Sequence, residues 1–153
     1  MTYVAVRVRG HAGVRGEIED TLGHLRLHKV NHAVVVPTND SYEGMLRKAR
    51  DYIAYGRLNP ATLAQALRSR GKVEGDKPLT DAYLAEHSTF RTIDDLANAI
   101  ANGQASLKDV PGLKPVLRLN PPRRGYGGNK RHYPMGALGD WGEDINDLVQ
   151  RMV

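Results

Sequence analysis

The sequence has 153 residues, 41% of them hydrophobic, with a formal net charge of +5 and a pI near 9.6. This length fits one domain, or one domain with an insertion, and the apolar fraction is too high for a disordered chain. Cysteine is absent, no apolar run is long enough for a membrane span, and residues 1–10 lack the core of a signal peptide, so we expect a soluble, cytosolic protein.

The first third of the chain predicts a strand, a helix and a second strand. Alternation over residues 2–9 is typical of a half-buried strand, and Ile18, Leu22 and Leu25 mark one face of a helix that follows a glycine-punctuated loop. Residues 33–36 predict a buried strand. This order favours a crossover unit, in which two parallel strands are joined by a helix. A second helix is predicted over residues 41–55, ended by Gly56.

The remainder predicts several helices and one more strand. Asn59 and Pro60 start a helix that ends at Gly71, and a short helical turn is expected over residues 80–87. Another helix is expected to begin at Thr92 and to end before Gly103. Residues 116–119 predict a third strand, and the last helix carries an apolar stripe over residues 145–152.

These elements predict an α/β (α+β) protein with a small three-stranded sheet. The expected order is β-α-β-α-β, a ferredoxin-like arrangement, with a helical insertion and a C-terminal helix. Residues 1–56 and 113–153 would form the α/β core, which we expect to carry the binding surface. Residues 57–112 would form the helical insertion.

Basic and acidic residues are segregated along the chain. The first sixteen residues contain three arginines and no acid, whereas acids gather in the middle and near the C-terminus. Between Val110 and Gly139 the charged residues are all basic: Lys114, Arg118, Arg123, Arg124, Lys130 and Arg131. Two basic segments set apart from the acids predict one anionic partner, contacted by one face of the protein.

The most informative segment, residues 117–134, interleaves arginine and lysine with Tyr126 and Tyr133 on a backbone rich in glycine and proline. Such a loop can approach phosphates closely, form charge-assisted hydrogen bonds and stack on bases. The alternative is a flexible, solvated loop. Without a balancing acid, however, that loop would repel itself for no gain, so we interpret it as a nucleic-acid contact.

Three histidines, His24, His28 and His32, have a spacing of four. On a helix this spacing could place two imidazoles on one face, as a metal site requires. The helix is expected to end near His28, and no cysteine or carboxylate is spaced to complete the site. We therefore predict neither a metal nor any other cofactor, and interpret these residues as a polar helix end or as RNA contacts.

Residues 9–16 form a second glycine-rich basic loop, placed between a strand and a helix N-terminus. Backbone N–H groups in such a loop can hold a phosphate. The loop superficially resembles that of acylphosphatases, which also need a strand-borne asparagine, but the candidate Asn31 lies before its strand. A phosphate-handling enzyme stays open as an alternative, and the same loop could grip an RNA phosphate.

Between Thr21 and Ile53 the sequence resembles the signature of the universal large-subunit ribosomal protein family L-thirty, called L-seven in eukaryotes. The matching positions are Thr21, Leu22, Leu25, Leu27, Lys29, His32, Val34, Met45, Leu46, Ala49, Tyr52 and Ile53. Residues 117–123 and 136–139 resemble the long archaeal form. That form often has histidine where this chain has Asn120, and glycine near Arg124.

The resemblance implies a structural component of the large ribosomal subunit, located in the cytoplasm. Its implied partners are large-subunit ribosomal RNA, near the 5S RNA, and neighbouring ribosomal proteins, with no catalysis, cofactor, membrane or small-molecule substrate. An archaeal source is expected, because the long basic N-terminal extension of eukaryotic members is absent.

We predict three groups of RNA contacts. The first comprises Arg118, Arg123, Arg124, Tyr126, Lys130, Arg131 and His132. The second comprises Arg7, Arg9 and Arg15. The third comprises His28, Lys29, Arg47, Lys48 and Tyr52. Besides the acylphosphatase-like enzyme, one more alternative stays open: a protein-interaction module in which the insertion is the functional surface.

Overall fold

The computed structural model describes residues 2–153, and its centre is a five-stranded sheet of order β6-β2-β1-β3-β7. The strands are β1 (Thr2–Arg7), β2 (His32–Pro37), β3 (Ile53–Arg57), β6 (Val116–Arg118) and β7 (Gly139–Asp140). β1 is antiparallel to both β2 and β3, β2 is antiparallel to β6, and β3 is parallel to β7. The short strand β6 therefore forms one edge of the sheet.

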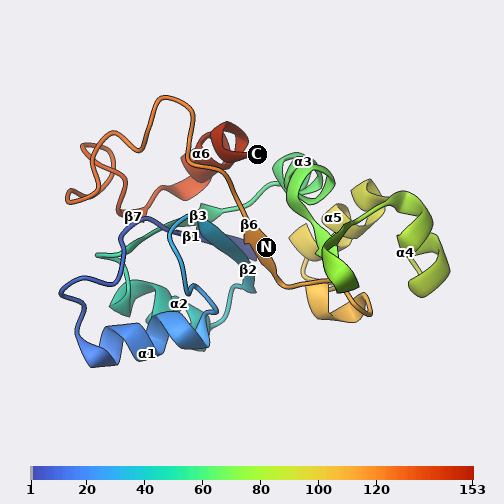
Figure 1. Ribbon diagram of the computed structural model, residues 1–153, viewed down its shortest axis with the longest axis horizontal. Helices are drawn as coiled ribbons and strands as arrows, with labels where there is room; N and C mark the ends of the chain where they lie inside the picture. The colour runs from blue at the N-terminus through green and yellow to red at the C-terminus, as the bar shows by residue number, and fades with distance from the viewer. Residues whose placement is uncertain (1) are drawn as a thin grey trace.

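Helices cover both faces of this sheet. α1 (Gly16–His24) and α2 (Asp40–Lys48) lie on one face, and α6 (Ile145–Met152) lies on the other (Figure 1). The alternation of β1 fits this layering, since Ala5 is buried in a cluster with residues of α1 and α2. Val4 and Val6 belong to the cluster that includes Ile145. Both faces of the central strand are thus buried.

The segment between β3 and β6 is largely helical and lies beside the sheet (Figure 1). Its helices are α3 (Pro60–Arg70), α4 (Asp81–His87) and α5 (Ile93–Ala101), together with a hairpin of β4 (Lys72–Val73) and β5 (Lys77–Pro78). Three-residue turns lie at η1 (Glu74–Asp76), η2 (Leu107–Asp109) and, after β7, η3 (Gly142–Asp144). As predicted, the Asn59 side chain caps α3, accepting a hydrogen bond of 2.8 Å from the Thr62 N–H.

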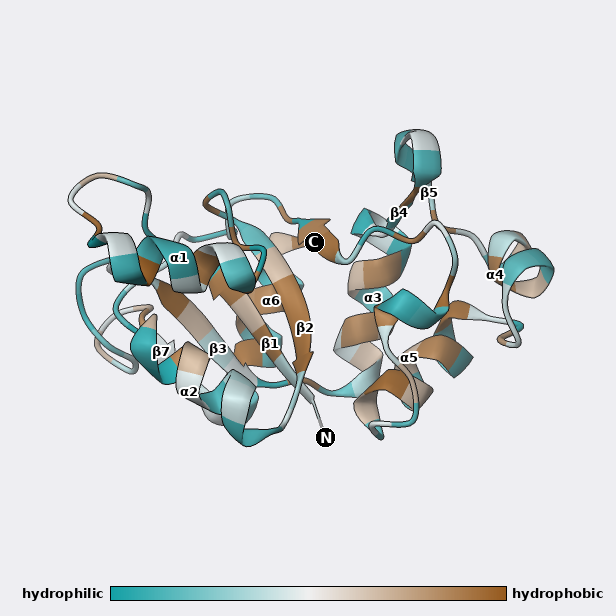
Figure 2. Ribbon diagram, turned by 90° about the horizontal axis from the view of Figure 1, so that it is seen from below, coloured by the Kyte–Doolittle hydropathy of each residue, from teal (hydrophilic) through white to brown (hydrophobic). Residues whose placement is uncertain are grey.

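The insertion shares its hydrophobic core with the sheet. Leu67 of α3 and Leu96 of α5 are fully buried, and they belong to the same cluster as Val6 and Leu148. Figure 2 shows hydrophobic residues along the strands and on α3, α5 and α6, whereas the loops are mostly hydrophilic. No helix within residues 2–153 is long and apolar enough to cross a membrane.

The predicted mixed α/β class is confirmed and is compatible with a ferredoxin-like α+β fold. The predicted three-stranded sheet is corrected to five strands, because β3 and β7 also pair in it. The prediction of one helix over residues 41–55 is wrong, because α2 ends at Lys48 and residues 53–57 form β3. Leu46, Ala49 and Ile53 have helical spacing, yet they reach the same core cluster from a helix, a turn and a strand. The crossover expected between the first two strands is also corrected, since β1 and β2 are antiparallel.

Candidate nucleic-acid interface

One end of the sheet gathers four irregular segments, which we call the loop end: residues 8–15, 26–31, 49–52 and 119–138. The last of these, the basic loop, connects β6 to β7 and is fixed to three other elements. The Arg151 guanidinium of α6 donates to the carbonyl oxygens of Arg123 and Gly125, at 3.0 and 2.9 Å. Nε2 of His132 lies 2.7 Å from a carboxylate oxygen of Asp51, just before β3.

The two tyrosines of the basic loop serve as anchors. The Tyr126 hydroxyl donates to the side-chain oxygen of Asn31, and burial raises the pKa of this phenol. Tyr133 stacks on Trp141, with ring centroids 4.4 Å apart, and its hydroxyl donates to Asp144. Both side chains are therefore partly buried and bonded within the protein, and stacking of a base on Tyr126 stays a prediction.

Three cations of the basic loop take no part in this anchoring. Arg124, Lys130 and Arg131 are exposed, and within the described part of the chain their side chains have no hydrogen bond or ion pair. Arg123 is exposed as well, although its guanidinium donates to the carbonyl of Gln150 at 3.2 Å. The loop thus holds free positive charge on a backbone that is tied down at several points.

The predicted RNA contact Arg7 is corrected by the structure, because its side chain is 0% exposed. Its guanidinium donates to the carbonyl of Leu27 at 2.7 Å and to that of Arg9 at 2.8 Å, and it pairs with Glu19 at 3.0 Å. The hydrogen bond from Arg7 lowers the pKa of the Glu19 carboxyl group. Arg7 therefore holds the 8–15 loop and α1 in place and is not available to RNA.

The other residues of the second group lie at the surface of the loop end. The Arg9 guanidinium sits 4.9 Å from the centroid of the Tyr52 ring and donates to the Asp51 carbonyl at 3.3 Å. Arg15, the residue immediately before α1, is exposed. Arg47 and Lys48 are exposed in the last turn of α2, immediately before the 49–52 turn, so they border the loop end.

His28 and Lys29 are exposed in the turn before β2, and His32 is half-buried on β2 itself. Across residues 2–153, no group of three or more His, Cys, Asp or Glu side chains could hold a metal ion. Arg118 lies on the edge strand β6, beside β2. Sequence reasoning did not place Arg26 and Lys114 near this edge, because residues so far apart in the chain give no local signal of a shared surface.

The geometry of residues 9–16 does not favour acylphosphatase chemistry. Asn31 lies just before β2 with a φ of 70°, and its side-chain oxygen accepts the hydrogen bond from Tyr126. Arg7, which ends β1 two residues before this loop, is buried in its pair with Glu19. Asn31 and Arg7 are therefore both engaged in holding the fold.

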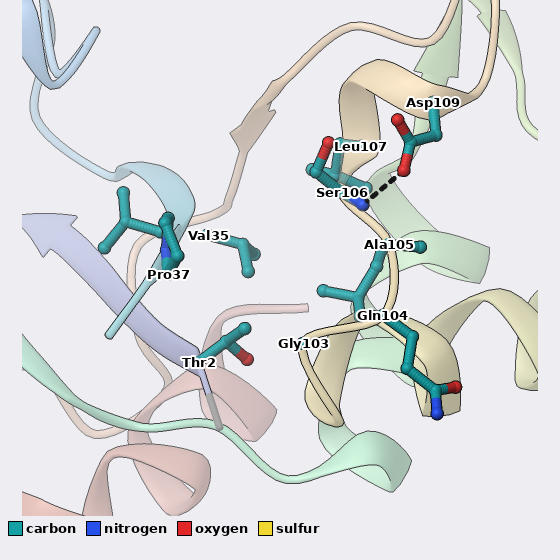
Figure 3. A pocket seen from close by; sticks show the side chains of 11 residues that line it. Thr2, Val35, Pro37, Gly103, Gln104, Ala105, Ser106, Leu107 and Asp109 are labelled. Atoms are coloured by element: carbon teal, nitrogen blue, oxygen red, sulfur yellow. Dashed lines mark hydrogen bonds between the residues drawn. The ribbon is translucent and has the colours of Figure 1, made fainter. Parts of the chain in front are cut away.

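An apolar groove of about 280 Å³ lies on another part of the surface, between β2 and residues 103–109 (Figure 3). Thr2, Val35 and Pro37 face Ala105 and Leu107 across it. Among the described lining residues only Asp109 is charged, and its carboxylate accepts a hydrogen bond of 2.9 Å from the Ser106 N–H. This groove is thus chemically distinct from the loop end.

Comparisons with known proteins agree with the sequence signature. Residues 3–53 match the model of the family described as ribosomal protein L30p/L7e. The large ribosomal subunit protein uL30 of Archaeoglobus fulgidus is 50% identical over 150 residues, which cover 98% of this chain and 99% of the relative. The uL30 proteins of Methanocorpusculum labreanum and Methanocella arvoryzae are 48% and 47% identical, with the same coverage.

The chain belongs to the uL30 family. The family predicted from residues 21–53 is therefore confirmed, and the match to the relatives extends over nearly all of the chain, including the helical insertion. All three of these uL30 relatives are archaeal, in line with the resemblance to the long archaeal form.

Proposed function

We propose that this uL30 family member is a structural, non-enzymatic constituent of the large ribosomal subunit in the cytoplasm, and that it binds ribosomal RNA through its loop end. The ribosomal assignment rests on the shared name of relatives that are 47 to 50% identical over 98% of the chain. The observation that supports the loop end as the RNA surface is the set of exposed, unpartnered cations on the anchored basic loop: Arg124, Lys130 and Arg131.

The proposed mechanism is electrostatic. Each cation that neutralises a phosphate releases a condensed counterion, so affinity falls steeply as salt rises. Anchoring adds to this, because a loop already fixed by Arg151, Asn31 and Asp51 loses little conformational entropy on binding. Arg9, Arg15, Arg47 and Lys48 would extend the same positive surface, whereas His132 and Tyr126 would act by holding the loop.

Its partners would be ribosomal RNA and neighbouring ribosomal proteins. We further propose a position near the 5S RNA, as the family resemblance implies. Crosslinking of the assembled subunit tests this: crosslinks from the basic loop to the 5S RNA, or to adjacent large-subunit RNA, would support it. Crosslinks confined to RNA segments far from the 5S RNA would refute that position, but they would not contradict the proposed role as a constituent of the large subunit.

Sedimentation of the tagged protein from its native cell tests the ribosomal assignment. We expect comigration with the large subunit through a sucrose gradient at moderate salt, persisting until high salt, because many phosphate contacts must be lost together. Migration as a free small protein at both salt concentrations would contradict the proposal. An acyl-phosphate turnover assay would then test the enzyme alternative.

A triple variant tests the loop end directly. Arg124→Asn, Lys130→Gln and Arg131→Gln remove three exposed charges, and asparagine suits the φ of 66° at position 124. We expect affinity for protein-free large-subunit RNA to fall about 100-fold, with a salt slope smaller by about three. The matched control is Lys77→Gln, Arg91→Gln and Lys108→Gln on the insertion, which removes the same charge. Equal losses of RNA affinity in the two variants would show that the loop end is not the RNA-binding surface.

A further inference from the structure

A second basic feature lies at the β6 edge of the sheet, on the side of α1. It is a surface hollow of about 250 Å³, which we call the edge hollow. Pro115 and Val116 give it an apolar floor. It is also lined by cationic or imidazole side chains from two separate segments: Arg26, His28, His32, Lys114 and Arg118.

Strand pairing sets the geometry of the edge hollow. His32 of β2 is directly opposite Arg118 of β6, and Val34 is opposite Val116, so these side chains share one face of the sheet. Arg26, with a φ of 63°, follows the end of α1 on that same face. The fold thus brings residues 26–32 and 114–118 together around one opening.

The cations of the edge hollow act on the half-buried side chain of His32. Burial lowers the pKa of His32, and the charges of Arg118, Lys29 and His28 lower it further. The carboxylate that reaches the rim is Asp76 of the β4–β5 hairpin, which lies 2.5 Å from Lys114 Nζ and 3.3 Å from Arg118 Nη2. All three side chains are exposed, so an incoming phosphate can replace this carboxylate.

We propose that the edge hollow binds one nucleotide of RNA, with its phosphate on the cationic rim and its ribose or base on Pro115 and Val116. This inference rests on the proposed function, which supplies the RNA. It adds a second contact, which shares Arg26 and His28 with the loop end and adjoins the basic loop, because Asn31 precedes His32 and is bonded to Tyr126. The combination of apolar floor and basic rim fits a nucleotide better than it fits a bare anion.

The first test compares two double variants in binding to protein-free large-subunit RNA. Lys114→Gln with Arg118→Gln removes two rim charges, and Lys77→Gln with Arg91→Gln removes two exposed charges from the insertion. We expect the rim variant to bind about tenfold more weakly at about 0.1 M salt, with a salt slope smaller by about two. The control should change by less than about twofold.

Small probes test what the hollow holds. Uridine monophosphate should shift the NMR resonances of the His32 ring in the full-length protein and raise the pKa of His32, because a phosphate offsets the charges of Arg118, Lys29 and His28. Inorganic phosphate should shift them less at equal concentration, since it lacks a nucleoside to lie on the apolar floor. Equal responses to the two probes would overturn the nucleotide assignment.

The outcomes separate this inference from the proposed function. If the triple variant of the basic loop loses affinity but the rim variant matches its control, the edge hollow is not an RNA contact. The same conclusion follows if uridine monophosphate binds but the rim variant still holds RNA normally, since the hollow would then take a free nucleotide. If the wild-type protein does not bind the RNA at all, the proposed function fails first.

A variant that is expected to raise the affinity for RNA excludes misfolding as the cause of the losses. Asp76→Asn removes the carboxylate that competes for Lys114 and Arg118, so RNA should bind about threefold more tightly. Asp94→Asn is the matched control, because it also removes an exposed carboxylate paired with an arginine, Arg68, on the insertion. Equal effects of the two substitutions would show that the added affinity does not arise at the edge hollow.

Discussion

The loop end and the helical insertion differ in how they use charge. Residues 57–112 contain seven basic and seven acidic side chains, whereas residues 113–139 contain six basic and no acidic ones. The insertion pairs some of its charges internally, as Arg68 does with Asp94. The basic loop instead keeps Arg124, Lys130 and Arg131 free and uses its polar anchors to fix the backbone. The insertion therefore uses some of its charges within the fold, whereas the basic loop keeps charges available for the RNA binding that we propose.

The largest effect should come from the core of the insertion. Leu67→Ala in α3 removes a fully buried side chain from the cluster that also contains Val6 and Leu148. We expect the free energy of unfolding to fall by about 2–5 kcal/mol, from lost burial and the cavity left behind. Urea denaturation, followed by both circular dichroism and the fluorescence of the single tryptophan, Trp141, measures this change.

The same experiment tests whether the insertion is a separate domain. Trp141 lies outside the insertion, stacked on Tyr133. Because the two regions share one cluster, both probes should report a single transition that moves to lower urea in the variant. A tryptophan signal unaffected by Leu67→Ala would show that the insertion folds on its own, as the predicted boundary at residues 57 and 112 allows.

The next effect distinguishes two arginines of the loop end. Arg7→Ala removes the buried guanidinium and leaves the Leu27 and Arg9 carbonyls without their donor. We expect a loss of about 2–4 kcal/mol in the free energy of unfolding, reduced from the cost for a fully buried pair because Glu19 is partly exposed.

Arg9→Ala is the matched comparison. It removes a half-exposed cation over Tyr52 and should cost less than about 1 kcal/mol of stability. For RNA binding by the folded protein we expect the opposite order: Arg9→Ala should reduce the affinity more than Arg7→Ala, since Arg9 is at the surface and Arg7 is buried. Equal destabilisation by the two substitutions would contradict the assignment of Arg7 to the interior.

Sequence patterns predicted the elements whose signals are local. The Asn59 cap, the strands at residues 2–7, 32–37 and 116–118, and the last helix follow from caps, alternation and apolar stripes. The strand β3 was missed because Leu46, Ala49 and Ile53 keep helical spacing across a turn. β7 was missed because two residues, Gly139 and Asp140, carry no periodicity.

Arg7 shows why the site was harder to predict than the fold. Alternation in β1 places Arg7 on the side away from Val4 and Val6, which is typical of the solvent side of a half-buried strand. The structure covers that side too, with α1 and α2, so Ala5 and Arg7 are both buried. A single strand carries no information on whether its second face is covered. The edge hollow was missed for a similar reason. Its residues are brought together by the pairing of β2 with β6, which the sequence of either strand does not reveal.

A smaller effect should separate anchoring from charge within the basic loop. Tyr126→Phe removes the hydroxyl that donates to Asn31 and leaves every cation in place. We expect a loss of about 1 kcal/mol in the free energy of unfolding. RNA affinity should fall about threefold with an unchanged salt slope, because the loop becomes less ordered before binding.

The control is Tyr83→Phe on the insertion, which removes the hydrogen bond to the Pro111 carbonyl. It should lower the free energy of unfolding without changing the affinity for RNA. A reduced salt slope in Tyr126→Phe would mean that anchoring and phosphate contact are not separable.

The smallest effect concerns pH and the buried network of the loop end. The pKa of Glu19 is lowered from its ordinary value of 4.5, first by the hydrogen bond from Arg7 and also by that from His11. A carboxyl group whose pKa is lower in the folded state stabilises the fold above its ordinary pKa, and this contribution disappears as pH falls through the folded-state value. Glu19→Gln should therefore be less stable than the wild type at about pH 7, and the two should converge as pH is lowered through the folded-state pKa of Glu19. Urea denaturation across this range measures the difference, with Glu86→Gln, an exposed position on α4, as the control. A constant gap between wild type and Glu19→Gln at every pH would show that the side chain acts through packing, and that the Arg7 network gains nothing from the charge of its carboxylate.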